Sequence, residues 1–185
     1  MVTHSARQAL GFQGVPLRLQ ASIEIRAPAQ IVFDLLCTPE RLPEWNASVE
    51  SVRRTEPGEP VRLGARCIMS GKLLGQTLES ETEVVVFDPP RAFATQARRG
   101  PHLLTQFRVE TQPFGSRVDA AVSGEVPGGR LGSMLAEGFL RRELGVSLQQ
   151  LKAICERAAR EQAADVPAQG GDPACWLHLT EPHDD

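Results

Sequence analysis

Turn-forming residues recur about every 8–15 positions between residues 48 and 125, and no helical segment separates them. These breaks are Pro57-Gly58-Glu59-Pro60, Gly75, Asp88-Pro89-Pro90, Gly100-Pro101 and Pro113-Phe114-Gly115. They bound strand-like segments at about 48–55, 64–73, 76–87, 91–98, 103–111 and 116–125. Consecutive strands with short connections pair as an antiparallel meander. An antiparallel sheet therefore forms the body of the predicted fold.

Helical and extended segments on either side complete the predicted order. Apolar and polar residues alternate from Leu17 to Ile25, which is typical of a strand with one face in water. Pro28 and Pro39 suit the first turns of two short helices, the second of which ends at Trp45-Asn46. Residues from about 130 to 163 have helical spacing, and a helix of ~30 residues is ~45 Å long. Because this helix needs an apolar partner, we expect an α+β fold in which it crosses the sheet.

Several of these segments resemble the START-like, or polyketide cyclase/dehydrase (SRPBCC), superfamily. The similar segments are Ile25 to Asp34, Thr38 to Asn46 with its final Trp-Asn pair, Gly64-Ala65-Arg66 and Phe87-Asp88-Pro89-Pro90-Arg91. The resemblance extends from about residue 17 to residue 160. It implies the helix-grip fold, in which about seven strands curl around a long C-terminal helix. It also implies a cavity for a hydrophobic ligand, but not one particular chemistry.

The two ends of the chain differ in composition from its body. Residues 161–185 hold six acidic residues and no Lys or Arg, whereas the whole chain has 23 acidic and 20 basic residues. We therefore predict a flexible lead-in over residues 1–14, a helix-grip domain over residues 15–163 and an acidic disordered tail over residues 164–185. The weak, dispersed positive charge of the body argues against nucleic-acid binding.

Cysteine spacing and hydropathy bear on location and cofactors. Cys37, Cys67, Cys155 and Cys175 form no CxxC pair, and no metal-ligand pattern or phosphate-binding loop is visible. No apolar run approaches the ~18 residues of a membrane span, and the first residues do not resemble a signal peptide. We expect a cytoplasmic protein with reduced thiols, no metal and no cofactor. The sequence gives no prediction of its oligomeric state.

Strand alternation predicts which side chains line a cavity. Glu79, Glu81 and Glu83 should face water, because three carboxylates buried together would be very unfavourable. The residues that alternate with these glutamates then face inward. Hydroxyl groups occur there among apolar side chains, which is typical of small-molecule pockets. Two helix glycines, Gly138 and Gly145, leave room for a ligand, kink the helix or allow it to pack closely on the sheet; the sequence favours none of the three. The predicted ligand-binding residues are Trp45, Arg66, Ser80, Thr82, Phe93, Thr95, Thr105, Phe107, Val122, Leu135, Gly138 and Phe139.

Three functions remain open from the sequence. The first is a binder of a lipid, a polyketide-like molecule or another hydrophobic metabolite, favoured because acid–base residues are few. His102 is the only histidine away from the chain ends, and its position predicts a turn or the convex face. The second is a cyclase/dehydrase-type enzyme that acts on a ligand in the same cavity. The third is a cochaperone-like interaction module, which would fill its cavity and expose an apolar patch.

Overall fold

The computed structural model describes residues 15–73, 76–126 and 129–165. The predictions for residues 1–14, the turn at Gly75 and residues 166–185, Cys175 included, lie outside this part of the chain. The strands are β1 (Val15–Ile25), β2 (Val49–Arg54), β3 (Arg66–Leu73), β4 (Gln76–Asp88), β5 (Ala92–Arg99), β6 (Leu103–Gln112) and β7 (Gly115–Val126). The helices are α1 (Ala29–Leu36), the single 3-10 turn η1 (Pro39–Arg41), α2 (Leu42–Trp45) and α3 (Gly129–Ala164).

The seven strands form one antiparallel sheet in the order β1-β7-β6-β5-β4-β3-β2. Strands β2 to β7 are a meander, as the spacing of turn residues predicts. Strand β1 lies at the opposite edge from β2, so the segment that holds α1, η1 and α2 carries the chain from one edge to the other. The predicted α+β class, the two short helices and the long C-terminal helix are confirmed.

The pairing of β4 with β5 has two irregularities. Its register shifts between Glu81 and Thr82, where Arg98 of β5 is the extra residue, and again between Val84 and Val86, where Val85 of β4 is the extra residue. An extra residue in one strand increases the local twist and reverses the alternation of side chains beyond it. Val84 is therefore buried, Val86 is exposed, and Phe87 packs against the core.

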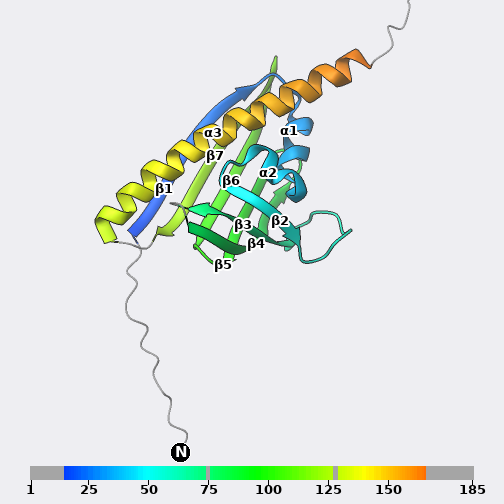
Figure 1. Ribbon diagram of the computed structural model, residues 1–185. Coiled ribbons are helices and arrows are strands. Elements are labelled where there is room, and N and C mark those ends of the chain that lie inside the picture. The colour runs from blue at the N-terminus through cyan, green and yellow to red at the C-terminus, as the bar shows by residue number, and fades with distance from the viewer. Residues whose placement is uncertain (1–14, 74–75, 127–128, 166–185) are drawn as a thin grey trace, which may run out of the picture.

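Helix α3 runs diagonally across the sheet, packs mainly on β1 and also touches α1 and α2 (Figure 1). Its C-terminal half joins the main core, where Leu148, Leu151 and Cys155 are almost fully buried. A smaller cluster of Leu17, Leu19 and Ala136 lies toward the other half of the helix. Helices α1 and α2 cover only the part of the sheet near the main core, so the other part has only α3 above it.

Candidate functional site

A pocket lies between the sheet and the first half of α3. It has a volume of about 160 Å³ and is open on one side. Strands β3, β4, β5 and β6 supply most of its wall, α3 supplies Leu140, and the start of β2 forms part of its edge. The pocket occupies the part of the sheet that α1 and α2 leave uncovered, because the main core fills the other part.

Apolar and hydroxyl side chains line the pocket, together with one charged residue. The apolar members are Val49, Met69, Leu78, Ala97, Pro101, Leu103 and Leu140, and Gly71 adds backbone. The hydroxyl members are Ser48, Ser70, Ser80, Thr82, Thr95 and Thr105, and the charged member is Lys72. Mostly apolar walls with a few polar groups are typical of small-molecule sites.

Four of the predicted ligand-binding residues meet in this wall: Ser80, Thr82, Thr95 and Thr105. They come from three neighbouring strands, and the alternation of each strand directs them to the same face. The glutamates between them face the other side, as predicted: Glu81 and Glu83 form ion pairs with arginines on the outer face. Contact of these four residues with a ligand stays a prediction.

Three predicted aromatic residues lie in the main core and do not line the pocket. Trp45 is 2% exposed and packs edge-on against Phe107, with ring centroids 5.9 Å apart. Phe93 packs edge-on against Phe33 at 6.5 Å. All three pack in one core cluster with residues of α1. Val122 packs against the smaller core cluster instead.

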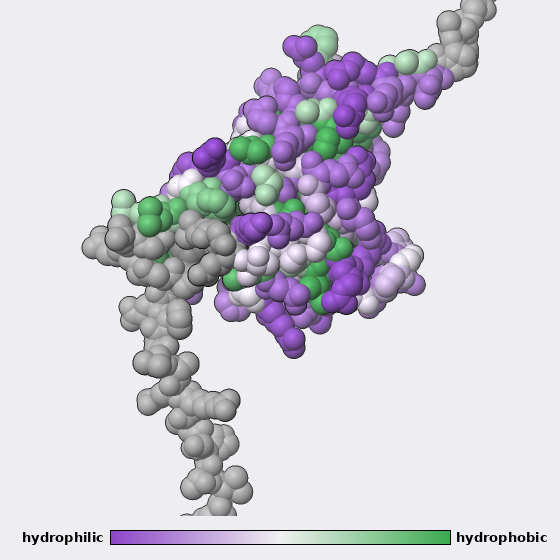
Figure 2. Space-filling view, in the orientation of Figure 1, coloured by the Kyte–Doolittle hydropathy of each residue, from purple (hydrophilic) through white to green (hydrophobic). Residues whose placement is uncertain are grey.

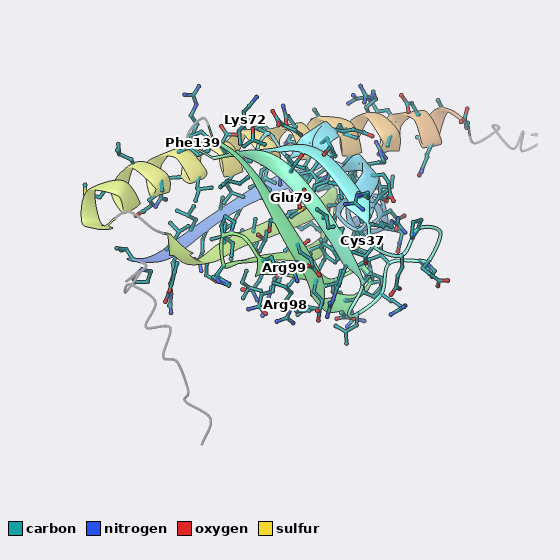
Figure 3. All side chains as sticks on the ribbon, turned by 60° about the horizontal axis from the view of Figure 1, so that its bottom comes forward. Cys37, Lys72, Glu79, Arg98, Arg99 and Phe139 are labelled. Carbon is teal, nitrogen blue, oxygen red and sulfur yellow. The ribbon has the colours of Figure 1, made fainter. Side chains whose placement is uncertain are left out.

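Arg66 belongs to the outer face of the sheet, not to the pocket. Its guanidinium lies 3.0 Å from Glu83 and 3.6 Å from Glu81. Arg98 also binds Glu83, and these two arginines, Arg98 first, hold the pKa of the Glu83 carboxyl below its usual value. Figure 3 shows Arg98 and Arg99 on the side of the sheet away from α3. Arg66 is therefore already engaged in a cross-strand ion-pair ladder.

The three predicted residues of α3 also lie outside the pocket lining. Leu135 is 63% exposed, Gly138 is exposed and Phe139 is half-buried. Gly138 and Gly145 are both exposed and absent from the pocket lining, and a Cβ added to either would meet nothing within 4 Å. Ala136 and Leu140 face the sheet instead. Figure 2 shows the resulting apolar surface at the N-terminal end of α3, where Met134 and Leu135 are exposed.

Most residues at the pocket's edge were not among the predicted ligand-binding residues. Met69 and Gly71 face Ser80 and Leu78 across the β3–β4 ladder, so alternation along β3 was a usable signal for both. Ser48 and Pro101 lie in connections between elements, where no periodicity marks them. Figure 3 shows Lys72 beside the first half of α3, near Phe139.

Lys72 is the only ionisable side chain among the described residues that line the pocket. Its ammonium lies 2.7 Å from the Glu50 carboxylate, and the side chain is 60% exposed. The hydrogen bond to Glu50 raises the pKa of Lys72 above its usual value. Lys72 is therefore protonated at neutral pH and is not available as a general base.

The three thiols in the described part of the chain are protected rather than activated. Burial raises the pKa of Cys37 and of Cys155 to about 12, and burial also raises the pKa of Cys67. A thiol nucleophile needs a lowered pKa and access to substrate. His102 is exposed in the turn before β6, outside the pocket. Among residues 15–73, 76–126 and 129–165, no three His, Cys, Asp or Glu side chains gather as a metal site would require.

Comparison with known proteins gives a family match over most of the chain. The family model described as polyketide cyclase/dehydrase and lipid transport matches residues 16–156. No curated protein matches the sequence. No helix in the described part of the chain combines the length and the hydropathy that a bilayer crossing requires.

Solved structures with low sequence identity share the fold. The protein TTHA0849 from Thermus thermophilus is 18% identical, with a TM-score of 0.65 over 77% of this chain and 99% of that one. A START superfamily protein from Mycobacterium smegmatis is 16% identical, with a TM-score of 0.57 over 78% and 98%. The di-domain ARO/CYC protein BexL of the BE-7585A biosynthetic pathway is 18% identical, with a TM-score of 0.58 over 78% and 50%.

Proposed function

The chain belongs to the polyketide cyclase/dehydrase and lipid transport family, and from that premise we propose that it binds a hydrophobic small molecule in the pocket between its sheet and α3. The observation that carries the proposal is the wall of this pocket, in which apolar and hydroxyl side chains surround an open volume of about 160 Å³. A lipid, a polyketide-like molecule or another hydrophobic metabolite suits such a wall.

The ionisable groups favour binding over catalysis. General acid–base chemistry needs a group whose pKa lies near the working pH and that reaches the substrate. Lys72 is paired with Glu50, and the described pocket wall holds no carboxylate, histidine or thiol. A binder needs none of these groups.

A cyclase/dehydrase-type enzyme is the alternative. The supporting observation is the row of hydroxyls on β4, β5 and β6, which would hold the oxygens of a substrate chain in a reactive shape. Proximity alone supplies a large share of the barrier reduction in such reactions. The likeness to BexL adds the fold alone, because the identity is only 18%.

A cochaperone-like module is the weaker alternative. It would use the exposed apolar side chains of Met134 and Leu135 to bind another protein. That role gives no reason for an open pocket lined by hydroxyls, which the binding proposal explains.

Native mass spectrometry of the full chain, purified from its own host, tests the proposal. We expect a bound apolar metabolite, which organic extraction then identifies. Ala97→Phe should abolish the bound mass, because Ala97 lines the pocket and the larger ring fills it. Ala153→Phe is the matched control, since Ala153 is exposed on α3.

Retention of the bound mass in a folded Ala97→Phe protein would place the ligand elsewhere. Incubation of the loaded protein, followed by a second extraction, separates the two leading functions. A binder returns the same molecule, whereas an enzyme returns a molecule of changed mass or isomeric form.

A further inference from the structure

Two of the hydroxyls in the pocket wall differ from the others in having no hydrogen-bond partner among the described residues. Ser70 bonds to Ser51 at 2.7 Å, Ser80 donates to the Arg99 carbonyl, and Thr82 contacts the Cys67 thiol at 3.1 Å. Ser48 donates to Glu143 at 3.3 Å. Thr95 and Thr105 make no side-chain hydrogen bond within the described part of the chain, and both are half-buried.

These two threonines are direct neighbours across two strands. Thr95 on β5 stands opposite Thr105 on β6 in the antiparallel register. Directly opposed residues have their Cβ atoms roughly 4.5–5.5 Å apart, and both side chains project from the same face of the sheet. One oxygen atom placed between the two hydroxyls is therefore within reach of hydrogen bonds from both.

A ligand that covers this pair removes it from water. A buried hydroxyl without a partner is strongly unfavourable, whereas one that bonds to the ligand is not. In the observed rotamers the two hydroxyls do not bond to each other, so a hydrocarbon leaves both unpaired, and a ligand with one well-placed oxygen satisfies both. A ketone oxygen accepts from both threonines, and a ligand hydroxyl accepts from one and donates to the other.

The charges at the pocket indicate that this oxygen is neutral. A carboxylate beside Thr95 and Thr105 would need a cation, and Lys72, the only charged residue in the described wall, is already paired with Glu50. Burying a carboxylate without a cation costs far more free energy than hydrogen bonds from two hydroxyls can offset.

The volume limits the size of the enclosed part of the ligand. An apolar cavity of roughly 150 Å³ in another protein holds one benzene molecule. The present pocket, at about 160 Å³, therefore has room for one six-membered ring with a small substituent, and its open side lets a longer ligand extend outward.

We propose that Thr95 and Thr105 form a clamp for a single neutral oxygen, a ketone or hydroxyl on the ring or chain end that enters the pocket. The inference rests on the proposed binding function and specifies its ligand class. The clamp makes Thr95 and Thr105 determinants of specificity, and Ser80 and Thr82, whose hydroxyls are already bonded, parts of the wall.

Acetophenone and ethylbenzene test the clamp, because both carry a two-carbon substituent on a phenyl ring and only acetophenone has an oxygen atom. Both are titrated by NMR into the full chain and into the Thr95→Val/Thr105→Val variant, which keeps the β-branched shape. The measured quantity is the affinity for acetophenone divided by the affinity for ethylbenzene. The different hydration of the free probes cancels when this ratio is compared between wild type and variant. We expect the ratio to fall about tenfold in the double variant and about threefold in each single variant.

Thr82→Val is the comparison variant. It makes the same chemical change on the same wall, at a hydroxyl that already has a partner in Cys67. Both affinities should therefore change by the same factor, and their ratio should stay constant. Benzoate, the charged probe of similar size, should bind more weakly than acetophenone.

The two levels of the proposal fail in different ways. If both neutral probes bind and the double variant leaves their ratio unchanged, the clamp is refuted and the binding pocket stands. If benzoate binds more tightly than acetophenone, the neutral oxygen is refuted. If neither neutral probe binds the wild-type chain, the binding function and the clamp are both refuted.

Discussion

The two halves of α3 should respond very differently to the same substitution. Leu151 is fully buried in the main core, whereas Leu135, four turns earlier, is 63% exposed. Leu→Ala removes the same atoms at both positions and improves helix propensity only slightly. The pair therefore isolates the contribution of packing under the helix.

The structure sets the expected magnitudes. Leu151→Ala loses the transfer free energy of a buried side chain and leaves a cavity, so we expect a destabilisation of about 3 kcal/mol. For a domain of this size, that corresponds to a fall in Tm of roughly 6–12 °C. Leu135→Ala should change stability by less than about 0.5 kcal/mol, as exposed positions do.

Urea unfolding followed by circular dichroism measures both variants. The midpoint should fall for Leu151→Ala with an unchanged slope, which identifies a change in stability rather than in the extent of unfolding. Comparable destabilisation by Leu135→Ala would show that the first half of α3 is packed in solution. A loss of less than about 1 kcal/mol for Leu151→Ala would refute the cavity argument itself.

Three further outcomes follow from other contacts. The Ser116 hydroxyl donates to the Ala27 carbonyl at 3.0 Å while fully buried, so Ser116→Ala should cost about 1–3 kcal/mol in urea unfolding; a neutral effect would contradict this bond. Burial raises the pKa of Cys155 to about 12, so iodoacetamide at pH 8 should modify it only after unfolding, and rapid modification of the native chain would show that the site opens. The Glu156 carboxylate accepts from the Arg26 backbone N–H at 3.0 Å, which lowers its folded-state pKa below 4.5. Its contribution is therefore present at neutral pH and is lost as the pH falls below that value, and the acid-induced loss of stability should be smaller in Glu156→Gln.

The meander from β2 to β7 and the inward face of its central strands were predictable from the sequence, whereas the pairing of β1 with β7 was not. Alternation is local, and the row of glutamates on β4 sets its phase, so Ser80 and Thr82 could be assigned to the inner face. The neighbouring strands follow because turn residues bound each of them. This is why four predicted hydroxyl residues do meet in one wall.

The helix and the edges of the pocket were not predictable in the same way. A helical pattern gives a period of 3.6 residues, but a small error in phase grows over 36 residues, so Leu135 was predicted in place of Ala136 and Leu140. Arg66 was predicted to bind ligand because it opens a strand. Its ion pairs with Glu81 and Glu83 were not predictable, because only the register of β3 and β4 brings these residues together. Trp45 was predicted to bind ligand, yet its depth in the core depends on how α2 is placed, which no local pattern shows.

The position of β1 at the edge of the sheet has a consequence for synthesis of the chain. β1 is translated first, and its sheet partner is β7, about 100 residues later in the register from Val15↔Val126 to Ile25↔Ser116. At roughly 5–20 residues per second, the ribosome needs about 5–20 s to produce that partner. During this interval the 11 residues of β1 lack their pairing partner, and α3, which packs on β1 in the folded domain, emerges after all seven strands. The apolar face of β1 therefore gains its cover only when the helix has left the exit tunnel.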